Sequence, residues 1–338
     1  MGISRMRKAL GAALIVSVAF AGPIAASVAA AAQPGWVDEI VSAVVRLKTH
    51  INPEGSTVPS LGREREGSAI LIDDRGLLLT IGYLMVEAYA AEVVDNAGHS
   101  IPADVVGYDA ESGFGLLRSI QSLKLRPTPL GRSAQVKEQD PVLIVSFGGA
   151  AMAGAAYVVA RREFAGSWEY LLEDALFTAP PHPAWSGAAL VSRDGKLVGV
   201  GSLVLRDATG GREQIPGNMF VPIDRLSPIL GELIANGRPS GPARPWLGVN
   251  TEELGGHLLV TRVTPGSPAE KAGLKSGDIV GGVNGEQAHG LADFYRKVWA
   301  LGGAGVSVPL DVLREGEMRR FDVRSINRLD QLKLKSTF

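Results

Sequence analysis

Cysteine is absent from the 338 residues of this chain. Its absence excludes a disulfide framework, a thiol nucleophile and a thiolate metal site. An excess of one charge is also missing, because 34 Lys and Arg residues nearly balance 35 Asp and Glu residues, for a formal net charge of −1. That balance argues against binding to nucleic acid or to a membrane through a polybasic surface. The five histidines show no metal-ligand spacing such as His-x-x-x-His, and we expect no metal and no other cofactor.

Long hydrophobic runs are missing after the first 32 residues, which have the form of a secretory signal. A basic start at Arg5, Arg7 and Lys8 precedes an apolar run from Ala9 to Phe20, and the alanine-rich stretch that follows suits signal-peptidase cleavage. The same segment is long enough to be an uncleaved membrane anchor, which is the alternative. Both interpretations place the folded part outside the cytoplasm, periplasmic or secreted, and only an uncleaved segment would attach it to a membrane.

The chain is long, apolar and rich in turn-forming residues. Its length suggests two domains, its hydrophobic content of 46% allows a sizeable core, and its 42 glycines and 20 prolines are typical of a turn-rich β protein. Regular short apolar runs indicate a β-sandwich or a β-barrel, between which the runs alone do not decide. We predict strands at residues 44–47, 68–73, 77–80, 92–94, 103–108, 115–118, 142–147, 155–160, 171–177, 188–192 and 197–205.

The domain boundary is predicted from one helix and one linker. Residues 221–235 have helical spacing, and Asn236-Gly237 is a suitable end for such a helix. The Pro- and Gly-rich stretch that follows is typical of a linker. We therefore expect domains and connecting segments at residues 36–237 (first domain), 238–245 (linker), 246–326 (second domain) and 327–338 (tail).

Residues 67–85 carry a resemblance to a known family. They run Gly-Ser-Ala-Ile-Leu-Ile-Asp-Asp-Arg-Gly-Leu-Leu-Leu-Thr-Ile-Gly-Tyr-Leu-Met, which resembles the opening of trypsin-like serine proteases of the HtrA (DegP/DegS) family. That family ends the stretch Leu-Thr-Asn-x-His-Val-Val, where the histidine is the general base, and Tyr83 stands at the histidine position. The resemblance implies a mainly β fold, a trypsin-like pair of six-stranded β-barrels with the active site between them.

The other two positions of the catalytic triad follow in the family's order and spacing. The family pattern Gly-Asn-Ser-Gly-Gly-Pro-Leu appears at residues 184–190 as Ala-Trp-Ser-Gly-Ala-Ala-Leu. The resemblance therefore puts Ser186 in the nucleophile position and makes the N–H groups of Ala184 and Ser186 the oxyanion donors. The family pattern Asp-x-x-Thr-Asp-Leu-Ala-Leu-Leu begins at Asp109, an earlier structural acid, and leaves Gly113 in the position of the catalytic aspartate.

These substitutions predict little or no peptidase activity. A tyrosine has a pKa near 10 and is a poor base at neutral pH, so we expect Tyr83 to fill space between the barrels. A tyrosinate base would need a neighbouring cation that the sequence does not place. Loss of the triad serine or histidine costs about 10⁶-fold in turnover. Ala184 and the prolines at 180, 181 and 183 favour a changed oxyanion loop. His182 is the one alternative base, and the other interpretation is a solvent-facing loop histidine.

The second domain resembles a PDZ domain of the bacterial HtrA arrangement. Ser-Pro-Ala-Glu-Lys-Ala-Gly-Leu-Lys-Ser-Gly-Asp-Ile-Val at residues 267–280, followed by Val-Asn-Gly at 283–285, carries the match. We expect an α+β domain with a helix at 291–301 and closing strands at 306–312 and 321–323. The resemblance implies a loop that binds a C-terminal carboxylate and an apolar pocket beside it. The implied residues are Trp246, Leu247, Gly248 and Val249 in the loop and Leu291, Phe294 and Val298 in the helix; Leu247 and Val249 can equally be core.

Together these features predict an HtrA-like envelope protein that does not cut. It would act in protein quality control as a PDZ-based scaffold, chaperone or regulator, binding protein C-termini or unfolded polypeptide. The alternative is an active serine endopeptidase with a rearranged site that uses Ser186. The resemblance also implies a homotrimer, or assembly with an active HtrA relative. The chain's own end, Lys335-Ser336-Thr337-Phe338, has the form of a PDZ ligand, with a frayed tail as the alternative.

Overall fold

The computed structural model describes residues 35–211 and 213–334. The predicted signal segment at residues 1–32 and the ligand-like end at 335–338 lie outside the described residues. In the part of the chain that is described, no helix is long and apolar enough to cross a membrane.

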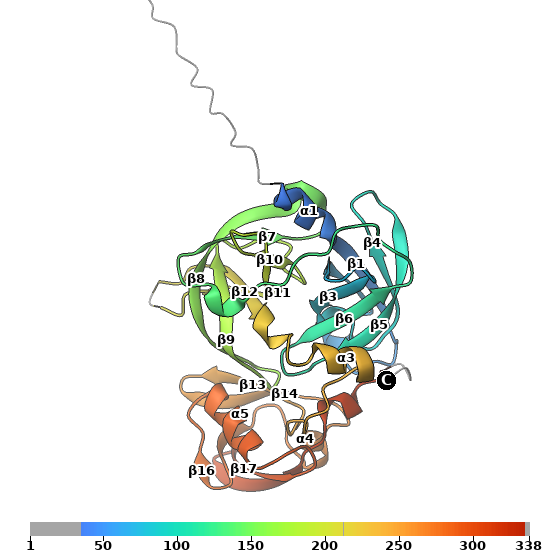
Figure 1. The fold of residues 1–338 in the computed structure, drawn as a ribbon. Helices are drawn as coiled ribbons and strands as arrows, with labels where there is room; N and C mark the ends of the chain where they lie inside the picture. The colour runs from blue at the N-terminus through green and yellow to red at the C-terminus, as the bar shows by residue number, and fades with distance from the viewer. Residues whose placement is uncertain (1–34, 212, 335–338) are drawn as a thin grey trace, which may run out of the picture. The chain divides into compact units, whose positions relative to one another are not determined.

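The first barrel is closed by six antiparallel strands in the order β1-β2-β3-β6-β5-β4 (Figure 1). Its strands are β1 (Val44–Ile51), β2 (Glu64–Leu71), β3 (Leu77–Ile81), β4 (Ala88–Val94), β5 (Ser100–Tyr108) and β6 (Phe114–Ser119). Three short helices accompany them: α1 (Trp36–Ala43), α2 (Val58–Leu61) and the 3₁₀ turn η1 (Gly82–Leu84). All five residues of β3 are buried, as expected for a strand between two neighbours inside a barrel.

The second barrel repeats this plan in the order β10-β11-β12-β9-β8-β7. Its strands are β7 (Pro141–Val145), β8 (Ala153–Gly166), β9 (Tyr170–Ala179), β10 (Ala189–Val191), β11 (Leu197–Leu205) and β12 (Gly217–Pro222). Its helices are η2 (Ser133–Gln135), η3 (Gly149–Met152) and η4 (Ile223–Arg225), while α3 (Leu230–Asn236), which follows them, packs against β5 of the first barrel. One apolar core cluster contains residues of both barrels. The predicted pair of six-stranded barrels is confirmed.

The predicted helix at residues 221–235 is wrong over its first part. Val221 and Pro222 end strand β12, which the sequence analysis missed, and every residue of that strand is buried. A short apolar run that is buried on both sides does not show the period of two that marks a half-buried strand, so its spacing also fits a helix. The predicted end is correct: α3 ends at Gly237, whose φ of 73° is left-handed and whose N–H donates to Leu233 O.

The C-terminal domain is a sheet with the strand order β13-β14-β15-β17-β18, in which β16 pairs with β15. Its strands are β13 (Val249–Leu254), β14 (His257–Val263), β15 (Ile279–Val283), β16 (Glu286–Gln287), β17 (Ser307–Arg314) and β18 (Glu317–Arg324). Its helices are α4 (Pro268–Lys271), α5 (Leu291–Ala300) and the turn η5 (Arg328–Gln331). Strand β13 lies at an edge of the sheet, where another extended segment can add. The predicted helix and closing strands of this domain are confirmed within a few residues.

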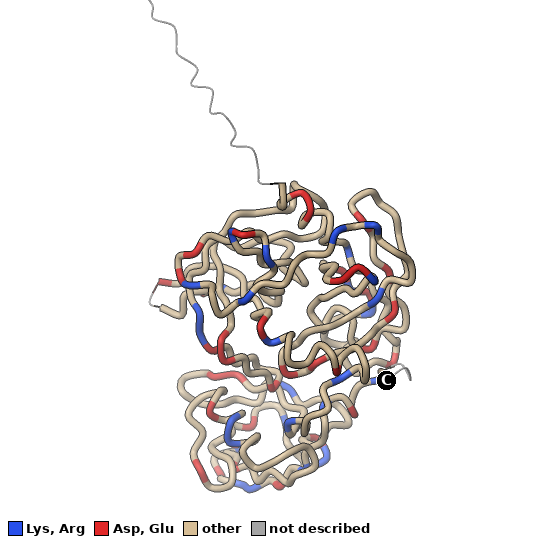
Figure 2. The backbone as a smooth tube through the Cα atoms, in the orientation of Figure 1, with Lys and Arg blue, Asp and Glu red and all other residues tan. Residues whose placement is uncertain are grey.

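Basic and acidic residues are interspersed along the described chain (Figure 2). Most of their ion pairs are exposed, as for Lys196 with Asp194 and Arg126 with Glu39. Exposed pairs of this kind contribute little to stability. The fold therefore depends on its apolar cores and on a few buried polar contacts.

Glu87 is the centre of one such contact. The residue is 2% exposed, and its carboxylate accepts hydrogen bonds from the backbone N–H groups of Ser56, Thr57 and Lys333 at 2.8, 2.9 and 2.8 Å. The hydroxyls of Ser56 and Thr57 donate to it as well. Burial acts to raise the pKa of Glu87, but the hydrogen bonds outweigh it and hold that pKa below its ordinary value. The charged side chain thereby ties the tail, through Lys333, to the first barrel.

We expect Glu87→Gln to lower the free energy of unfolding by about 2 kcal/mol at neutral pH. The glutamine amide carries no charge, and its NH₂ group, which cannot accept a hydrogen bond, faces backbone N–H donors that then lose their acceptor. A carboxyl whose pKa is depressed on folding contributes stability above its unfolded pKa, and this contribution is lost as the pH falls through its folded pKa. The deficit of the variant should therefore shrink below about pH 4.3. Urea unfolding at a series of pH values measures this deficit. Glu64→Gln is the control, because the Glu64 side chain is 84% exposed. A deficit that does not change with pH would contradict this role.

Candidate functional site

Tyr83 lies in the turn η1, directly after β3, and its side chain reaches two residues of the second barrel. The phenol oxygen is 2.9 Å from the Ser186 Oγ and 2.8 Å from the backbone carbonyl oxygen of Ser202. A phenol has one hydrogen to donate, and a carbonyl oxygen can only accept. Tyr83 therefore donates to Ser202, and the Ser186 hydroxyl donates to Tyr83.

The phenol of Tyr83 is a poor proton acceptor in this position. Burial raises the pKa of Tyr83 to about 12, although its hydrogen bonds act in the opposite direction. A tyrosinate would need a cation beside the phenol oxygen. The Arg65 guanidinium lies near this turn but donates elsewhere, to the backbone carbonyl oxygen of Tyr83 at 2.6 Å and to Thr57 Oγ1 at 2.7 Å. Tyr83 thus stays neutral and holds the Ser186 hydroxyl without activating it.

The position of the catalytic aspartate is filled by other groups. Gly113 has a φ of 85°, which glycine adopts freely and other residues adopt at a cost. A Cβ there would lie 3.6 Å from the Tyr170 hydroxyl oxygen, and that hydroxyl donates to the Ser112 carbonyl oxygen at 2.7 Å. The nearby carboxylate of Asp109 accepts from Ser112 N at 2.8 Å and from its hydroxyl. Asp109 therefore closes its own turn, as predicted, and orients no base.

The oxyanion loop is altered at Ala184. Its N–H, one of the two predicted oxyanion donors, donates to His182 Nδ1 at 3.2 Å. The prediction of a solvent-facing His182 is wrong, because this residue is 8% exposed and its own N–H donates to Asn218 Oδ1 at 2.6 Å. Burial lowers the pKa of His182, and its hydrogen bonds to the backbone of Met152 and Ala184 only partly oppose that shift. The ring is committed to backbone partners, so His182 does not replace the missing base.

Ser186 lies in a loop that is held against the first barrel. Its carbonyl oxygen accepts from Ser68 N at 2.8 Å, which joins the loop to the first barrel. The next residue, Gly187, has a φ of 72°, and a Cβ there would lie 2.0 Å from the Ser68 carbonyl oxygen. Glycine is thus required at this approach of two backbones. The loop presents a serine hydroxyl, but the structure supplies it with neither a base nor an oriented carboxylate.

The predicted carboxylate-binding loop of the PDZ domain already holds a carboxylate. The N–H groups of Leu247, Gly248 and Val249 donate to the side chain of Glu169, at 2.8, 2.6 and 2.9 Å. Trp246 does not take part, since its N–H donates to the Ile326 carbonyl oxygen. Burial raises the pKa of Glu169, while the three N–H donors act to lower it. The loop thus has the predicted chemistry, and a residue of the second barrel occupies it.

The predicted pocket beside the loop is also filled. Phe294 and Val298 are 0% and 2% exposed, and they share one apolar cluster with Leu247, Val249 and Leu171 of strand β9. Leu291 packs against this cluster without being fully buried. Leu247 and Val249 are therefore core and groove residues at once. The sequence analysis missed Glu169 and Leu171, because nothing in a single sequence pairs them with a loop almost eighty residues further along.

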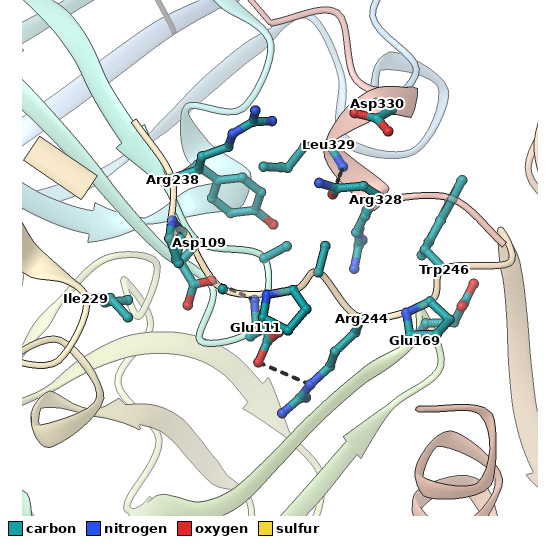
Figure 3. A pocket seen from close by; sticks show the side chains of 18 of the residues that line it. Asp109, Glu111, Glu169, Ile229, Arg238, Arg244, Trp246, Arg328, Leu329 and Asp330 are labelled. Atoms are coloured by element: carbon teal, nitrogen blue, oxygen red, sulfur yellow. Dashed lines mark hydrogen bonds and ion pairs between the residues drawn. The ribbon is translucent and has the colours of Figure 1, made fainter. Parts of the chain in front are cut away.

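The linker runs along a cavity of about 720 Å³ (Figure 3). Arg244 of the linker pairs with Glu111 at 3.1 Å and lies over the Trp299 ring, 4.2 Å from its centroid. Glu169 and Trp246 lie together at one edge of this cavity. The linker is thereby held to both domains by one ion pair and one cation–π contact. In the described ranges no cluster of His, Asp or Glu side chains is suited to hold a metal ion.

Comparison with known proteins supports the fold and the order of the domains. Residues 67–200 match the trypsin-like peptidase domain family, and residues 245–324 match the PDZ domain family. The chain is 29% identical over 251 residues to a probable periplasmic serine endoprotease, DegP-like, of Rhizobium meliloti, covering 70% of this chain and 48% of that protein. It is 27% identical over 267 residues to a probable periplasmic serine protease, do/HhoA-like, of Haemophilus influenzae, covering 74% of this chain and 56% of that protein.

The chain spans about half the length of these curated relatives. Among solved structures, the HtrA-type protease AlgW with a decapeptide has a TM-score of 0.51 at 22% identity, covering 89% of this chain and 100% of that one. That likeness concerns the fold, and it agrees with a pair of barrels followed by one PDZ domain.

We expect Tyr83→Phe to lower the free energy of unfolding by about 2 kcal/mol, because the Ser202 carbonyl and the Ser186 hydroxyl both lose their partner in a closely packed place. Urea unfolding measures the effect. Tyr89→Phe is the matched control, since Tyr89 is 51% exposed and should lose little. Equal stability of the two variants would mean that the phenol does not bridge the barrels as described.

Proposed function

We propose that this chain, a member of the HtrA (DegP/DegS-like) family with one trypsin-like peptidase domain and one PDZ domain, binds proteins in the bacterial envelope without cutting them. The contact between Ser186 and Tyr83 is the observation that carries the proposal. A serine attacks a peptide carbonyl only when a base removes its proton. Here the proton is donated to a phenol that is itself neutral.

The changes at Tyr83, Gly113 and Ala184 all affect one step, the attack of the serine on a peptide carbonyl. Among the described residues no other group replaces the lost functions. Tyr83 has a pKa of about 12 and cannot accept the proton at physiological pH. Gly113 offers no carboxylate to orient a base, and the Ala184 N–H is engaged by His182 rather than free for an oxyanion. Since loss of a triad member alone costs about 10⁶-fold in turnover, the expected rate is at the background of the assay.

The PDZ domain is the part that retains a binding chemistry. PDZ domains bind an extended C-terminus by adding it to a sheet edge and holding its carboxylate with backbone N–H groups. We propose that the protein uses this domain as a scaffold, chaperone or regulator in protein quality control. Its partners would be protein C-termini or unfolded polypeptide.

Location and assembly belong to the same proposal. Relatives named periplasmic proteases, together with the signal-like segment at residues 1–32, support an envelope location. We propose the domain limits 36–237 and 246–326, joined by the linker at 238–245. A homotrimer, or assembly with an active HtrA relative, is the proposed form in which the barrels act.

We expect no hydrolysis of unfolded casein by the purified protein, and the same null rate for Ser186→Ala. Tyr83→His alone should not restore activity, because Gly113 provides no orienting carboxylate and Ala184 remains bonded to His182. Release of fluorescence from labelled casein measures the rate, with an active DegP-like protease as the positive control. Hydrolysis that Ser186→Ala abolishes would instead support the alternative, an endopeptidase with a rearranged site.

A further inference from the structure

We infer that residues 166–171, at the tip of the β8–β9 hairpin, are an internal ligand of the PDZ groove, and that a protein C-terminus must displace Glu169 to bind. This inference rests on the proposed function of the PDZ domain as a binding module. It concerns how the groove is regulated and which chemical groups an external partner must carry. The hairpin reproduces three features of a bound C-terminal peptide, namely its carboxylate, a backbone hydrogen bond to a sheet edge and its apolar side chain.

The carboxylate is supplied by Glu169. Three consecutive N–H groups, those of Leu247, Gly248 and Val249, converge on its two oxygens. Hydrogen bonds of this charge-assisted kind are among the strong ones in proteins, and a C-terminal carboxylate would need the same donors. Glu169 and a ligand terminus therefore cannot be bound at the same time.

Both walls of the groove contact the hairpin. On the sheet side, the N–H of Thr251 in the edge strand β13 donates to the Ser167 carbonyl oxygen at 2.8 Å. On the helix side, the Tyr295 hydroxyl of α5 donates to the Gly166 carbonyl oxygen at 2.7 Å and accepts from Glu169 N at 3.3 Å. The tip therefore lies between β13 and α5, which is where an added peptide strand would lie.

The apolar side chain is supplied by Leu171. It comes from β9, is 7% exposed and belongs to the apolar cluster of Leu247, Val249 and Phe294. A ligand that replaces the hairpin must offer the cluster a comparable group. The chemistry of the internal ligand thus indicates a partner with a free C-terminal carboxylate and an apolar last residue.

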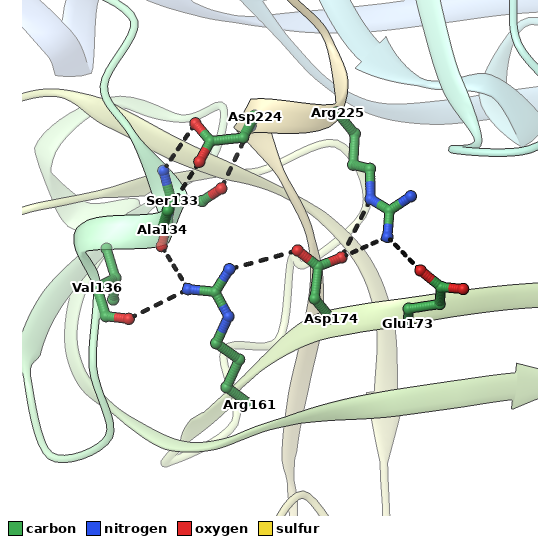
Figure 4. Close-up of polar contacts among 8 residues, drawn as sticks. All are labelled: Ser133, Ala134, Val136, Arg161, Glu173, Asp174, Asp224 and Arg225. Atoms are coloured by element: carbon green, nitrogen blue, oxygen red, sulfur yellow. Dashed lines mark hydrogen bonds and ion pairs between the residues drawn. The ribbon is translucent and has the colours of Figure 1, made fainter.

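The base of the hairpin is fixed to its own barrel, so the internal ligand is presented in a defined place (Figure 4). Asp174 of β9 pairs with Arg161 of β8 at 3.3 Å and with Arg225 of η4 at 2.8 Å. Arg161 also donates to the Ser133 carbonyl oxygen at 2.7 Å. A hairpin anchored in this way loses little further freedom when its tip enters the groove.

The tip itself is held from the PDZ side. Arg328 donates to the Trp168 carbonyl oxygen at 3.2 Å, and Arg296 of α5 forms an ion pair with Glu163 of β8. Glu169 has a φ of 56°, an unfavourable conformation for a residue with a Cβ. Such conformations persist where the surroundings impose them. Here the contacts with the PDZ domain hold Glu169 in this conformation. Removing its carboxylate should therefore release the tip.

An internal ligand lowers the apparent affinity for an external one. When only a fraction of molecules has an open groove, the apparent Kd is the intrinsic Kd divided by that fraction. Because Glu169 is part of the same chain, its effective concentration at the loop is high. Loss of its hydrogen bonds should therefore tighten external binding by about tenfold or more.

The experiment compares the full chain with Glu169→Ala and with the isosteric Glu169→Gln. The probe is a library of fluorescent decapeptides with a free carboxylate, an apolar last residue and random residues before it; the same library amidated at its end is the blank. Glu173→Ala is the matched control, since Glu173 lies on β9 close to the tip, has a side chain that is 68% exposed, and pairs with Arg225 rather than with the loop. Circular dichroism confirms that each variant is folded.

We expect the enriched peptides to bind Glu169→Ala at least about tenfold more tightly than the parent and the control, and the amidated library to bind none of them. Independently of any peptide, amide hydrogen exchange at residues 247–249 should be faster in both Glu169 variants. Equal affinity and equal exchange would overturn the internal ligand and leave the PDZ binding function standing. No binding by any of the proteins would overturn both, because a groove that binds nothing has nothing to regulate.

Discussion

The single proton of the Tyr83 phenol is the constraint from which the chemistry of this site follows. The Ser202 carbonyl can only accept, so it takes that proton, and the Ser186 hydroxyl must then donate to the phenol oxygen. A histidine in the same place would have presented a basic nitrogen to Ser186. Tyr83 and Ser186 instead form a hydrogen bond that joins the two barrels. The Ser186 hydroxyl therefore has a structural contact in this site.

Two neighbouring residues of one hairpin join the altered peptidase site to the PDZ groove. Tyr170 donates to Ser112, next to Gly113 at the aspartate position, and Glu169 accepts from the PDZ loop. A working peptidase would need a carboxylate where the Tyr170 hydroxyl lies. The tip of the β8–β9 hairpin thus contacts both the aspartate position and the PDZ loop. In the account proposed above, the barrels present this tip to the adjoining domain as an internal ligand.

The sequence was sufficient for the double barrel and the PDZ domain, because motif order and spacing survive substitution. It misplaced the start of the helix before the linker, because the fully buried strand β12, which ends at Pro222, has no period of two. It could not predict the contacts of Tyr83 with Ser202, or of Glu169 with Gly248, since these join residues 119 and 79 positions apart. Such contacts depend on how closed barrels and domains pack, which no local pattern encodes.

The central claim is that the Ser186 hydroxyl is not activated, and its reactivity toward a fluorophosphonate probe tests that claim most directly. The probe forms a covalent adduct with a serine whose proton is removed by a base, and mass spectrometry of the peptide that contains Ser186 detects the adduct. The account predicts no adduct at neutral pH and none up to about pH 10, because the Tyr83 phenol titrates at about 12. Stoichiometric labelling at neutral pH that disappears in Ser186→Ala would contradict it.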